Sequence, residues 1–269
     1  MRLKLRCEMN ETGLIPYNYN HQLQNVIYRL IQKSSPEFSA FLHNIGFIDG
    51  NKPFKLFTFS KLLFADYTAT QRGFEGVKEF SILISTPIKE SYEHLVLGIF
   101  AKQEFELFFS EKHSVKVSIS SVESLPEAVI ESEMHFLTLS PIVTSIDNKT
   151  EDYGGQHFLD CMNPEERERY ISNIYQNLLR KHRVIYKEEY GGDDRFEFAF
   201  DVDYILKRQG KIRKKINFKR DTTSGKYIQI IGMEAPFTIK TDPELIKIGY
   251  QCGFGEKNSA GFGMVERTI

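Results

Sequence analysis

Arg2-Leu-Lys-Leu-Arg-Cys-Glu-Met9 opens the chain with a strict alternation of charged and apolar side chains. This two-residue period predicts a strand with one face in the core. Apolar residues then recur at helical spacing, which predicts an amphipathic helix over about 19–33. The other elements expected in this half are strands over 54–64 and 79–85, a helix over 91–102, and strands over 105–109 and 115–119. The order strand, helix, strand, strand, helix, strand is that of a ferredoxin-like domain.

The same order of elements begins again after Pro126. Asn163-Pro164-Glu165-Glu166 is a strong helix start, because Asn suits the N-cap and acidic residues suit the first turn. This helix is expected to run to about Lys181. The other elements expected here are strands over 135–143, 196–206, 227–239 and 262–266, and a short helix from Thr241-Asp242-Pro243. The sequence therefore predicts an α+β protein of two tandem ferredoxin-like domains, residues 1–125 and 126–269.

Composition narrows the class of protein and its compartment. Of 269 residues, 35 are Lys or Arg and 36 are Asp or Glu, so any attraction for a polyanion has to come from local clustering. The three cysteines stand far apart without metal-ligand or disulfide spacing, which fits a reducing cytosol. No apolar run approaches the roughly 18–20 residues of a membrane span, and no signal-peptide core follows Met1. We therefore expect a cytoplasmic protein without a membrane partner.

One basic stretch stands out against this neutral balance. Eight Lys and Arg residues and no acidic residue lie between Lys207 and Arg220. Such a concentration of one sign predicts contact with a nucleic acid, and the alternative is a solvated β-hairpin whose lysines serve solubility. The residues predicted to bind nucleic acid are Lys207, Arg208, Lys211, Arg213, Lys214 and Lys215.

A glycine-rich segment precedes the last expected strand. Its sequence is Gly249-Tyr-Gln-Cys-Gly-Phe-Gly-Glu-Lys-Asn-Ser-Ala-Gly-Phe-Gly-Met-Val265, in which two Gly-Phe-Gly triplets bracket a polar loop. Glycines at this density suit a backbone with positive φ, or amide groups that face an anion. The spacing is neither that of a dinucleotide-binding turn nor that of a phosphate-binding P-loop. The alternative is a glycine-rich bulge or hairpin without a ligand.

Three polar residues of the first half are candidates for chemistry. Ser35-Pro36 predicts a short helix that ends near Gly46; its expected buried stripe is Phe38, Phe41, Leu42 and Ile45. His43 falls off this stripe, so we expect an outward imidazole suited to proton transfer near neutral pH. Tyr28 lies off the apolar stripe of the preceding helix, and Lys55 begins the next strand. From spacing alone, the usual interpretation of all three is that of ordinary surface residues.

Metal and cofactor sites leave recognisable spacings, and the sequence shows none of them. It lacks a His-Glu-x-x-His motif, paired Cys motifs and carboxylate clusters of ligand spacing. We therefore expect neither a metal nor a cofactor.

Several of these segments together resemble one protein family over essentially the full length of the chain. They are Leu23-Gln-Asn-Val-Ile-Tyr28, Phe41-Leu-His43, Lys55-Leu-Phe-Thr-Phe-Ser60, Phe136-Leu-Thr-Leu-Ser-Pro141 and the glycine-rich segment up to Gly263. The chain resembles the CRISPR repeat-RNA-processing endoribonucleases of the repeat-associated mysterious protein superfamily. The glycine-rich segment is the most specific of these matches.

The resemblance implies two RNA-recognition-module-like domains and metal-independent cleavage of the repeat in a CRISPR precursor transcript. The RNA's own 2′-hydroxyl would be the nucleophile, leaving a 2′,3′-cyclic phosphate and a 5′-hydroxyl. The family's catalytic positions fall on Tyr28, His43 and Lys55 in the first domain. His43 would be a general acid or base, Tyr28 would position or share the proton transfer, and Lys55 would stabilise phosphorane charge. Lys52 is a rival for the lysine role, because the connection after His43 looks longer than usual.

We expect the basic stretch and the glycine-rich loop of the second domain to hold the repeat RNA. The loop residues predicted to bind RNA are Gly253, Gly255, Lys257, Asn258, Ser259, Gly261 and Gly263. A CRISPR interference complex is a further candidate partner, and the sequence leaves the oligomeric state open. Two other classes of protein remain. One is a non-catalytic RNA-binding subunit of the same superfamily, which would not need His43; the other is a small-molecule enzyme that holds a nucleotide phosphate in the loop.

Overall fold

The computed structural model describes residues 1–150 and 153–268, and it divides into two compact units. Unit 1 consists of Met1–Glu127 together with Ser259–Gly261, and unit 2 consists of Ala128–Asn258 and Phe262–Ile269. The sequence places the whole glycine-rich segment in the second domain, whereas these three residues of it belong to unit 1.

Unit 1 is built on an antiparallel sheet with the order β4-β7-β1-β9-β8. Its strands are β1 (Arg2–Ile15), β4 (Thr58–Phe59), β7 (Phe74–Ser85), β8 (Glu104–Ser110) and β9 (His113–Leu125), and the short β5 (Leu63–Phe64) and β6 (Thr68–Ala69) also pair with β7. β1 is central, because Leu5 faces Ile82 of β7 on one side and Val122 of β9 on the other. Apart from the added edge strand β8, this is the ferredoxin-like order.

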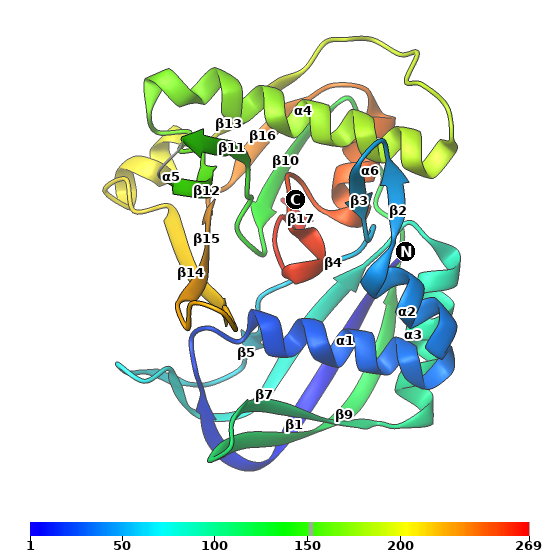
Figure 1. Cartoon of the computed structure of the whole chain (residues 1–269), viewed down its shortest axis with the longest axis vertical. Helices are drawn as coiled ribbons and strands as arrows, with labels where there is room; N and C mark the ends of the chain where they lie inside the picture. The colour runs from blue at the N-terminus through cyan, green and yellow to red at the C-terminus, as the bar shows by residue number, and fades with distance from the viewer. Residues whose placement is uncertain (151–152, 269) are drawn as a thin grey trace. The chain divides into compact units, whose positions relative to one another are not determined.

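Helices α1 (Asn20–Ser34) and α3 (Lys89–Ala101) cover one face of this sheet (Figure 1). Leu23 and Ile27 of α1 join Leu5 and other alternate strand residues in one buried cluster. α3 approaches α1 closely at Gly98, where a Cβ atom would lie 1.8 Å from the carbonyl oxygen of Leu30. Between α1 and β4 the chain forms α2 (Pro36–Asn44) and a hairpin of β2 (Phe47–Asp49) and β3 (Lys52–Phe54).

Unit 2 has a four-stranded sheet with the order β13-β16-β10-β17. Its strands are β10 (Glu133–Thr138), β13 (Glu197–Phe200), β16 (Phe237–Lys240) and β17 (Val265–Arg267), and its helices are α4 (Pro164–Tyr186), α5 (Val202–Lys207) and α6 (Pro243–Cys252). When the four strands are numbered by their order in the chain, they lie in the sheet as second, third, first and fourth. This arrangement is again ferredoxin-like. The structure therefore confirms the predicted α+β fold with two such sheets.

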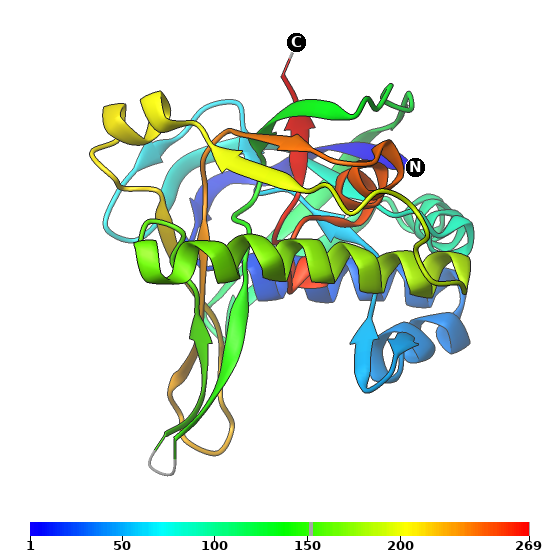
Figure 2. The same ribbon diagram turned by 90° about the horizontal axis from the view of Figure 1, so that it is seen from above.

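Two hairpins are added to unit 2: β11 (Ser145–Thr150) with β12 (Tyr153–Phe158), and β14 (Arg213–Arg220) with β15 (Tyr227–Met233). Within unit 2 they extend side by side, away from α4 (Figure 2). The β11–β12 hairpin has no counterpart among the elements expected from the sequence.

Three predicted strands are interrupted or cut short, each for a local reason. The strand expected over 54–64 is broken, because Leu56 has the left-handed φ of +50°. The strand expected over 196–206 ends at Phe200, since Asp201 caps the short helix α5 by accepting a hydrogen bond from the Tyr204 amide at 2.9 Å. The strand expected over 227–239 is two strands, which are separated at Pro236.

Two further expectations, one about burial and one about the end of a strand, also need correction. Ile45, expected in the buried stripe of α2, is the C-cap residue and is 52% exposed. The strand expected over 135–143 ends at Thr138. In both cases the regular element stops before the apolar pattern in the sequence does.

Candidate active site and nucleic-acid interface

Tyr28 and His43 meet at the junction of α1 and α2 in unit 1. Ser35 accepts a hydrogen bond from the Phe38 amide at 3.1 Å and so caps α2. The Ser39 hydroxyl donates to the Tyr28 carbonyl at 3.1 Å, which holds α2 against α1. As a result, the Tyr28 and His43 rings lie edge to face with centroids 5.4 Å apart.

The imidazole of His43 is exposed in the last turn of α2, as the sequence predicts. Its Nδ1 lies 3.0 Å from the side-chain oxygen of Asn44. Because that oxygen can only accept, the hydrogen bond requires the proton of a neutral ring on Nδ1. Nε2 is then the basic nitrogen.

Lys55 reaches the same helix end from the segment that follows β3. Its Nζ donates a hydrogen bond to the carbonyl oxygen of His43 at 3.0 Å. Partial burial lowers the pKa of Lys55. The next residue, Leu56, is buried with φ of +50°, a strained backbone of the kind often found at functional sites. Gly46 leaves room for the lysine, because a Cβ atom there would lie 2.9 Å from its Cδ.

Lys52, the rival lysine, has a different position. It lies in β3 of the β2–β3 hairpin, where it faces Asp49 across the two strands. The structure therefore brings Tyr28, His43 and Lys55 together through direct contacts and places Lys52 in the hairpin.

Partial burial of Tyr28 affects the protonation of its hydroxyl. The ring is half-buried and packs edge to face on Phe57 at 5.8 Å between centroids. Burial raises the pKa of Tyr28 to about 12, while a hydrogen bond with the Ser259 side chain acts in the opposite direction. Tyr28 is therefore a phenol, and not a phenolate, at neutral pH.

The glycines of the glycine-rich segment contact other protein atoms closely. A Cβ atom at Gly255 would lie 2.3 Å from the Val143 carbonyl oxygen, and one at Gly263 would lie 2.0 Å from that of Phe254. Both glycines are buried and have positive φ. Packing within unit 2 and the positive φ therefore account for glycine at both positions, and the contact of these glycines with RNA stays a prediction. Lys257 is exposed at the turn.

A buried lysine that the sequence analysis did not single out organises this segment. Lys181 of α4 is 1% exposed, and its Nζ donates to Gly253 O at 2.6 Å, Gly255 O at 3.1 Å and Asn258 Oδ1 at 2.8 Å. Asn258 in turn donates through Nδ2 to Phe254 O at 3.2 Å and to Phe262 O. The signal was present in the helical spacing, since Lys181 continues the buried stripe of Tyr170, Ile174 and Leu178.

The predicted basic residues are exposed on α5, on the turn after it and on β14 of unit 2. The exposed members are Lys207, Arg208, Lys211, Arg213, Lys214 and Lys215. The Arg208 guanidinium lies over the Tyr204 ring, 5.5 Å from its centroid, and Arg213 Nε is 3.9 Å from Asp160. Adjacent strand residues point to opposite faces, so Lys214 and Lys215 extend from both sides of the β14–β15 hairpin.

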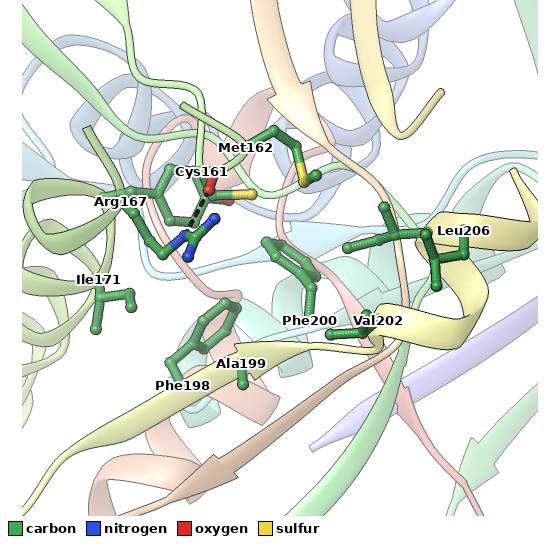
Figure 3. Close-up of a pocket in the computed structure, with 11 residues that line it drawn as sticks. Cys161, Met162, Arg167, Ile171, Phe198, Ala199, Phe200, Val202 and Leu206 are labelled. Carbon is green, nitrogen blue, oxygen red and sulfur yellow. Dashed lines mark hydrogen bonds between the residues drawn. The ribbon is translucent and has the colours of Figure 1, made fainter. Parts of the chain in front are cut away.

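Unit 2 also contains an apolar pocket of about 320 Å³ between the start of α4, β13 and α5 (Figure 3). Phe198, Phe200 and Met162 line it, and Leu206 stands at its α5 side. The one charged side chain among its lining residues is Arg167, whose Nε donates to the Cys161 carbonyl at 3.2 Å.

The described parts of the chain contain neither a cluster of metal ligands nor a helix suited to a membrane. Within residues 1–150 and 153–268, no three His, Cys, Asp or Glu side chains gather in a way that could hold a metal ion. None of the described helices combines the length and the apolar composition needed to cross a membrane.

Comparison with known proteins places both halves of the chain in one family. The family model for the N-terminal part of CRISPR-associated protein Cas6 matches residues 14–118, and the model for its C-terminal part matches residues 123–267. The chain is 31% identical to the CRISPR-associated endoribonuclease Cas6 1 of Methanocaldococcus jannaschii, covering 98% of this chain and 92% of that protein. It is 30% identical to the CRISPR-associated endoribonuclease Cas6 of Pyrococcus furiosus, covering 94% of this chain and 83% of the relative.

A solved structure described as CRISPR associated protein Cas6 superposes with a TM-score of 0.73 at 29% identity, covering 100% of this chain and 99% of the other. The family models, the two relatives and this structure agree over almost the whole length. The chain therefore belongs to the Cas6 family of CRISPR-associated proteins.

Proposed function

We propose that this protein is an endoribonuclease that cleaves CRISPR precursor transcripts within the repeat, without a metal ion, to release guide RNAs. The observation that carries the proposal is the cluster of Tyr28, His43 and Lys55 in unit 1, joined by a 5.4 Å ring contact and a 3.0 Å hydrogen bond. The names of the two relatives at 30% and 31% identity, both endoribonucleases, support the same activity.

The three side chains can supply what transesterification of RNA needs. The 2′-oxygen upstream of the cut attacks the adjacent phosphorus, and the bond from phosphorus to the 5′-oxygen breaks. His43 takes the 2′-hydroxyl proton on its basic Nε2, and Tyr28, which keeps its proton at neutral pH, protonates the departing 5′-oxygen. The products are a 2′,3′-cyclic phosphate and a 5′-hydroxyl.

Lys55 is assigned to the charge that develops on the phosphorane oxygens. Its ammonium is fixed beside His43 by the hydrogen bond to the His43 carbonyl, whereas Lys52 lies across from Asp49 in the hairpin. A fixed cation aimed at developing charge stabilises a transition state without reorganisation at the moment of reaction. This geometry favours Lys55 over Lys52 for the role.

RNA backbone binding is assigned to the exposed basic residues of unit 2. Lys207, Lys211, Lys214 and Lys215 are all exposed on or beside the β14–β15 hairpin. Each phosphate that such a side chain neutralises releases a counterion, so binding is expected to weaken with salt. Unit 1 carries the chemistry and unit 2 supplies this part of the affinity.

The direct test compares cleavage of end-labelled repeat RNA by the wild type and by His43→Ala under single-turnover conditions. His135→Ala is the matched control, because His135 is an exposed histidine of unit 2. Loss of a proton-transfer group is expected to slow cleavage by about 10²–10⁴-fold, with the control unchanged. Tight binding without cleavage by the wild type would instead identify a non-catalytic RNA-binding subunit.

A further inference from the structure

The apolar pocket of unit 2 takes no part in the proposed cleavage chemistry. It lies between the start of α4, β13 and α5 and has a volume of about 320 Å³ (Figure 3). Small-molecule sites measure about 300–1,000 Å³, so this pocket is at the small end and suits a single planar ring system. Its rim is open to solvent, because Met162 is 39% exposed, Val202 65% and Leu206 69%. Apolar side chains gathered in this way at a surface pocket indicate a ligand.

The walls of the pocket suit an aromatic ligand. Phe198 and Phe200, two residues apart on β13, both line it, and their rings meet edge to face at 5.1 Å between centroids. Such a corner gives a planar ligand one ring to stack on and a second ring to abut. An unpaired nucleobase is a ligand of this kind, since single-stranded RNA is commonly held by stacking its bases on aromatic side chains.

One polar group among the lining residues can recognise the edge of a base. Arg167 Nε donates to the Cys161 carbonyl at 3.2 Å, which orients the guanidinium, and Figure 3 shows this group among the side chains of the pocket. The other four N–H donors of an arginine lie on its two terminal nitrogens, in a rigid fork that matches two adjacent acceptors. O6 and N7 of guanine are such a pair, and arginine to guanine is the commonest specific side-chain contact with DNA bases.

The charge around the pocket complements a polyanion. Lys207 and Arg208 follow the α5 residues of the rim directly, and both are exposed. At the Cys161 wall, Arg213 Nε lies 3.9 Å from Asp160. A base that enters the pocket would therefore have cations at both walls for the phosphates on either side of it. This arrangement favours a nucleotide of an RNA chain over a plain apolar ligand.

We propose that this pocket binds one unpaired guanine base of the RNA, which stacks on Phe198 and Phe200 and accepts hydrogen bonds from Arg167 through O6 and N7. The inference rests on the proposed function, because that function supplies the RNA. It adds a base-specific site to the backbone contacts assigned to the exposed lysines. None of these three residues is among those predicted from the sequence to bind RNA.

The first experiment measures affinity for a short uridine RNA with one central guanosine, adenosine or 7-deazaguanosine, which lacks N7. This probe contains no repeat, so it reports binding and not cleavage. The wild type should prefer guanosine to adenosine by about 5- to 100-fold and to 7-deazaguanosine by about 3- to 10-fold. Arg167→Gln should reduce both preferences to within about two-fold.

The matched control for Arg167→Gln is Arg169→Gln. It removes the same charge from an exposed arginine of α4 that does not line the pocket, so a general electrostatic loss cancels in the comparison. Arg169→Gln should keep both preferences. Equal affinity for the three RNAs in the wild type, no binding of any of them, or a preference that survives Arg167→Gln would overturn the proposal.

Two further measurements locate the bound base. Ultraviolet crosslinking of a probe with 6-thioguanosine at its central position should modify peptides from residues 161–171 or 198–206. Phe200→Leu, which keeps an apolar side chain but removes a stacking ring, should weaken binding of the guanosine probe by about 5- to 100-fold. Crosslinks found only outside these peptides, or full affinity in Phe200→Leu, would contradict the proposed site.

Sedimentation of the protein without RNA tests a competing occupant, a second copy of the chain. Self-association that Leu206→Gln abolishes, together with no guanosine preference, would assign the rim to a protein interface and overturn the proposal. Failure of the proposed function is distinguishable. A wild type that prefers guanosine but leaves repeat RNA uncut would end the proposed function and keep the pocket, whereas one that cuts repeat RNA without this preference would do the reverse.

Discussion

Replacing Lys181 by Met should loosen the glycine-rich segment of unit 2. The substitution keeps a side chain of similar length but removes the ammonium that bonds Gly253 O, Gly255 O and Asn258 Oδ1. Hydrogen bonds from a charged group contribute about 1.5–3 kcal/mol each to stability, and three of them are lost. Removing the buried charge also removes the cost of its desolvation, which offsets part of this loss. We expect a net destabilisation of about 2–4 kcal/mol.

Thermal unfolding and amide hydrogen exchange together test this expectation. For a domain of this size, the expected destabilisation corresponds to a fall in Tm of roughly 5–15 °C. The control variant is Lys247→Met, which replaces an exposed lysine of α6. Exchange should accelerate at the amides of Phe254 and Glu256, which donate to Gly263 O and Val143 O within unit 2. A variant within about 0.5 kcal/mol of the wild type, with protection unchanged at both amides, would refute the assigned role of the lysine.

Four other substitutions test separate parts of the account. Lys214→Ala and Lys215→Ala should each weaken RNA binding and reduce the slope of log affinity against log salt by roughly 0.7, whereas an unchanged slope in titrations at several salt concentrations would remove them from the interface. Lys55→Arg should move the alkaline limb of the pH–rate profile for cleavage to higher pH. The pKa of Lys55 is lowered, so its charge is lost at a lower pH than that of an ordinary lysine, whereas arginine stays charged. An unmoved limb would assign that limb to another group. A hydrogen bond from the Asp160 amide holds the pKa of Glu166 below its ordinary value. The contribution of the Glu166 carboxylate to stability is therefore present above the unfolded pKa and is lost as pH falls. Urea unfolding should show the stability deficit of Glu166→Gln shrinking from pH 6 toward about pH 3, and a constant deficit would contradict the linkage.

Element order could be predicted from the sequence because most elements bury one regular face. The alternation from Arg2 to Met9 and the Asn163 cap of α4 both have local patterns strong enough to survive in the fold. The pattern fails where one residue changes the backbone, as at Leu56 with positive φ and at Asp201, which caps a helix in the middle of an apolar run.

Only part of the candidate site could likewise be predicted from the sequence. The spacing places His43 and Tyr28 off the apolar stripes of consecutive helices, and it is the family resemblance that marks them as catalytic candidates. The contact of Lys55 with the His43 carbonyl depends on a strained loop that no periodicity encodes. The glycines of the last segment were interpreted as a ligand-binding surface, whereas the structure also gives them close protein neighbours such as Val143 and Phe254. Contacts between residues far apart in sequence determine which of these uses a glycine serves.

The most direct test of the central claim is cleavage of repeat RNA in EDTA, with an intact substrate and with one that lacks only the 2′-hydroxyl upstream of the cut. If the RNA's own hydroxyl is the nucleophile and protein groups supply the proton transfers, the intact RNA is cut in EDTA to a 2′,3′-cyclic phosphate and a 5′-hydroxyl. The deoxy substrate should then bind and stay uncut. Cleavage that stops in EDTA and returns with Mg²⁺, or cleavage of the deoxy substrate, would contradict the account.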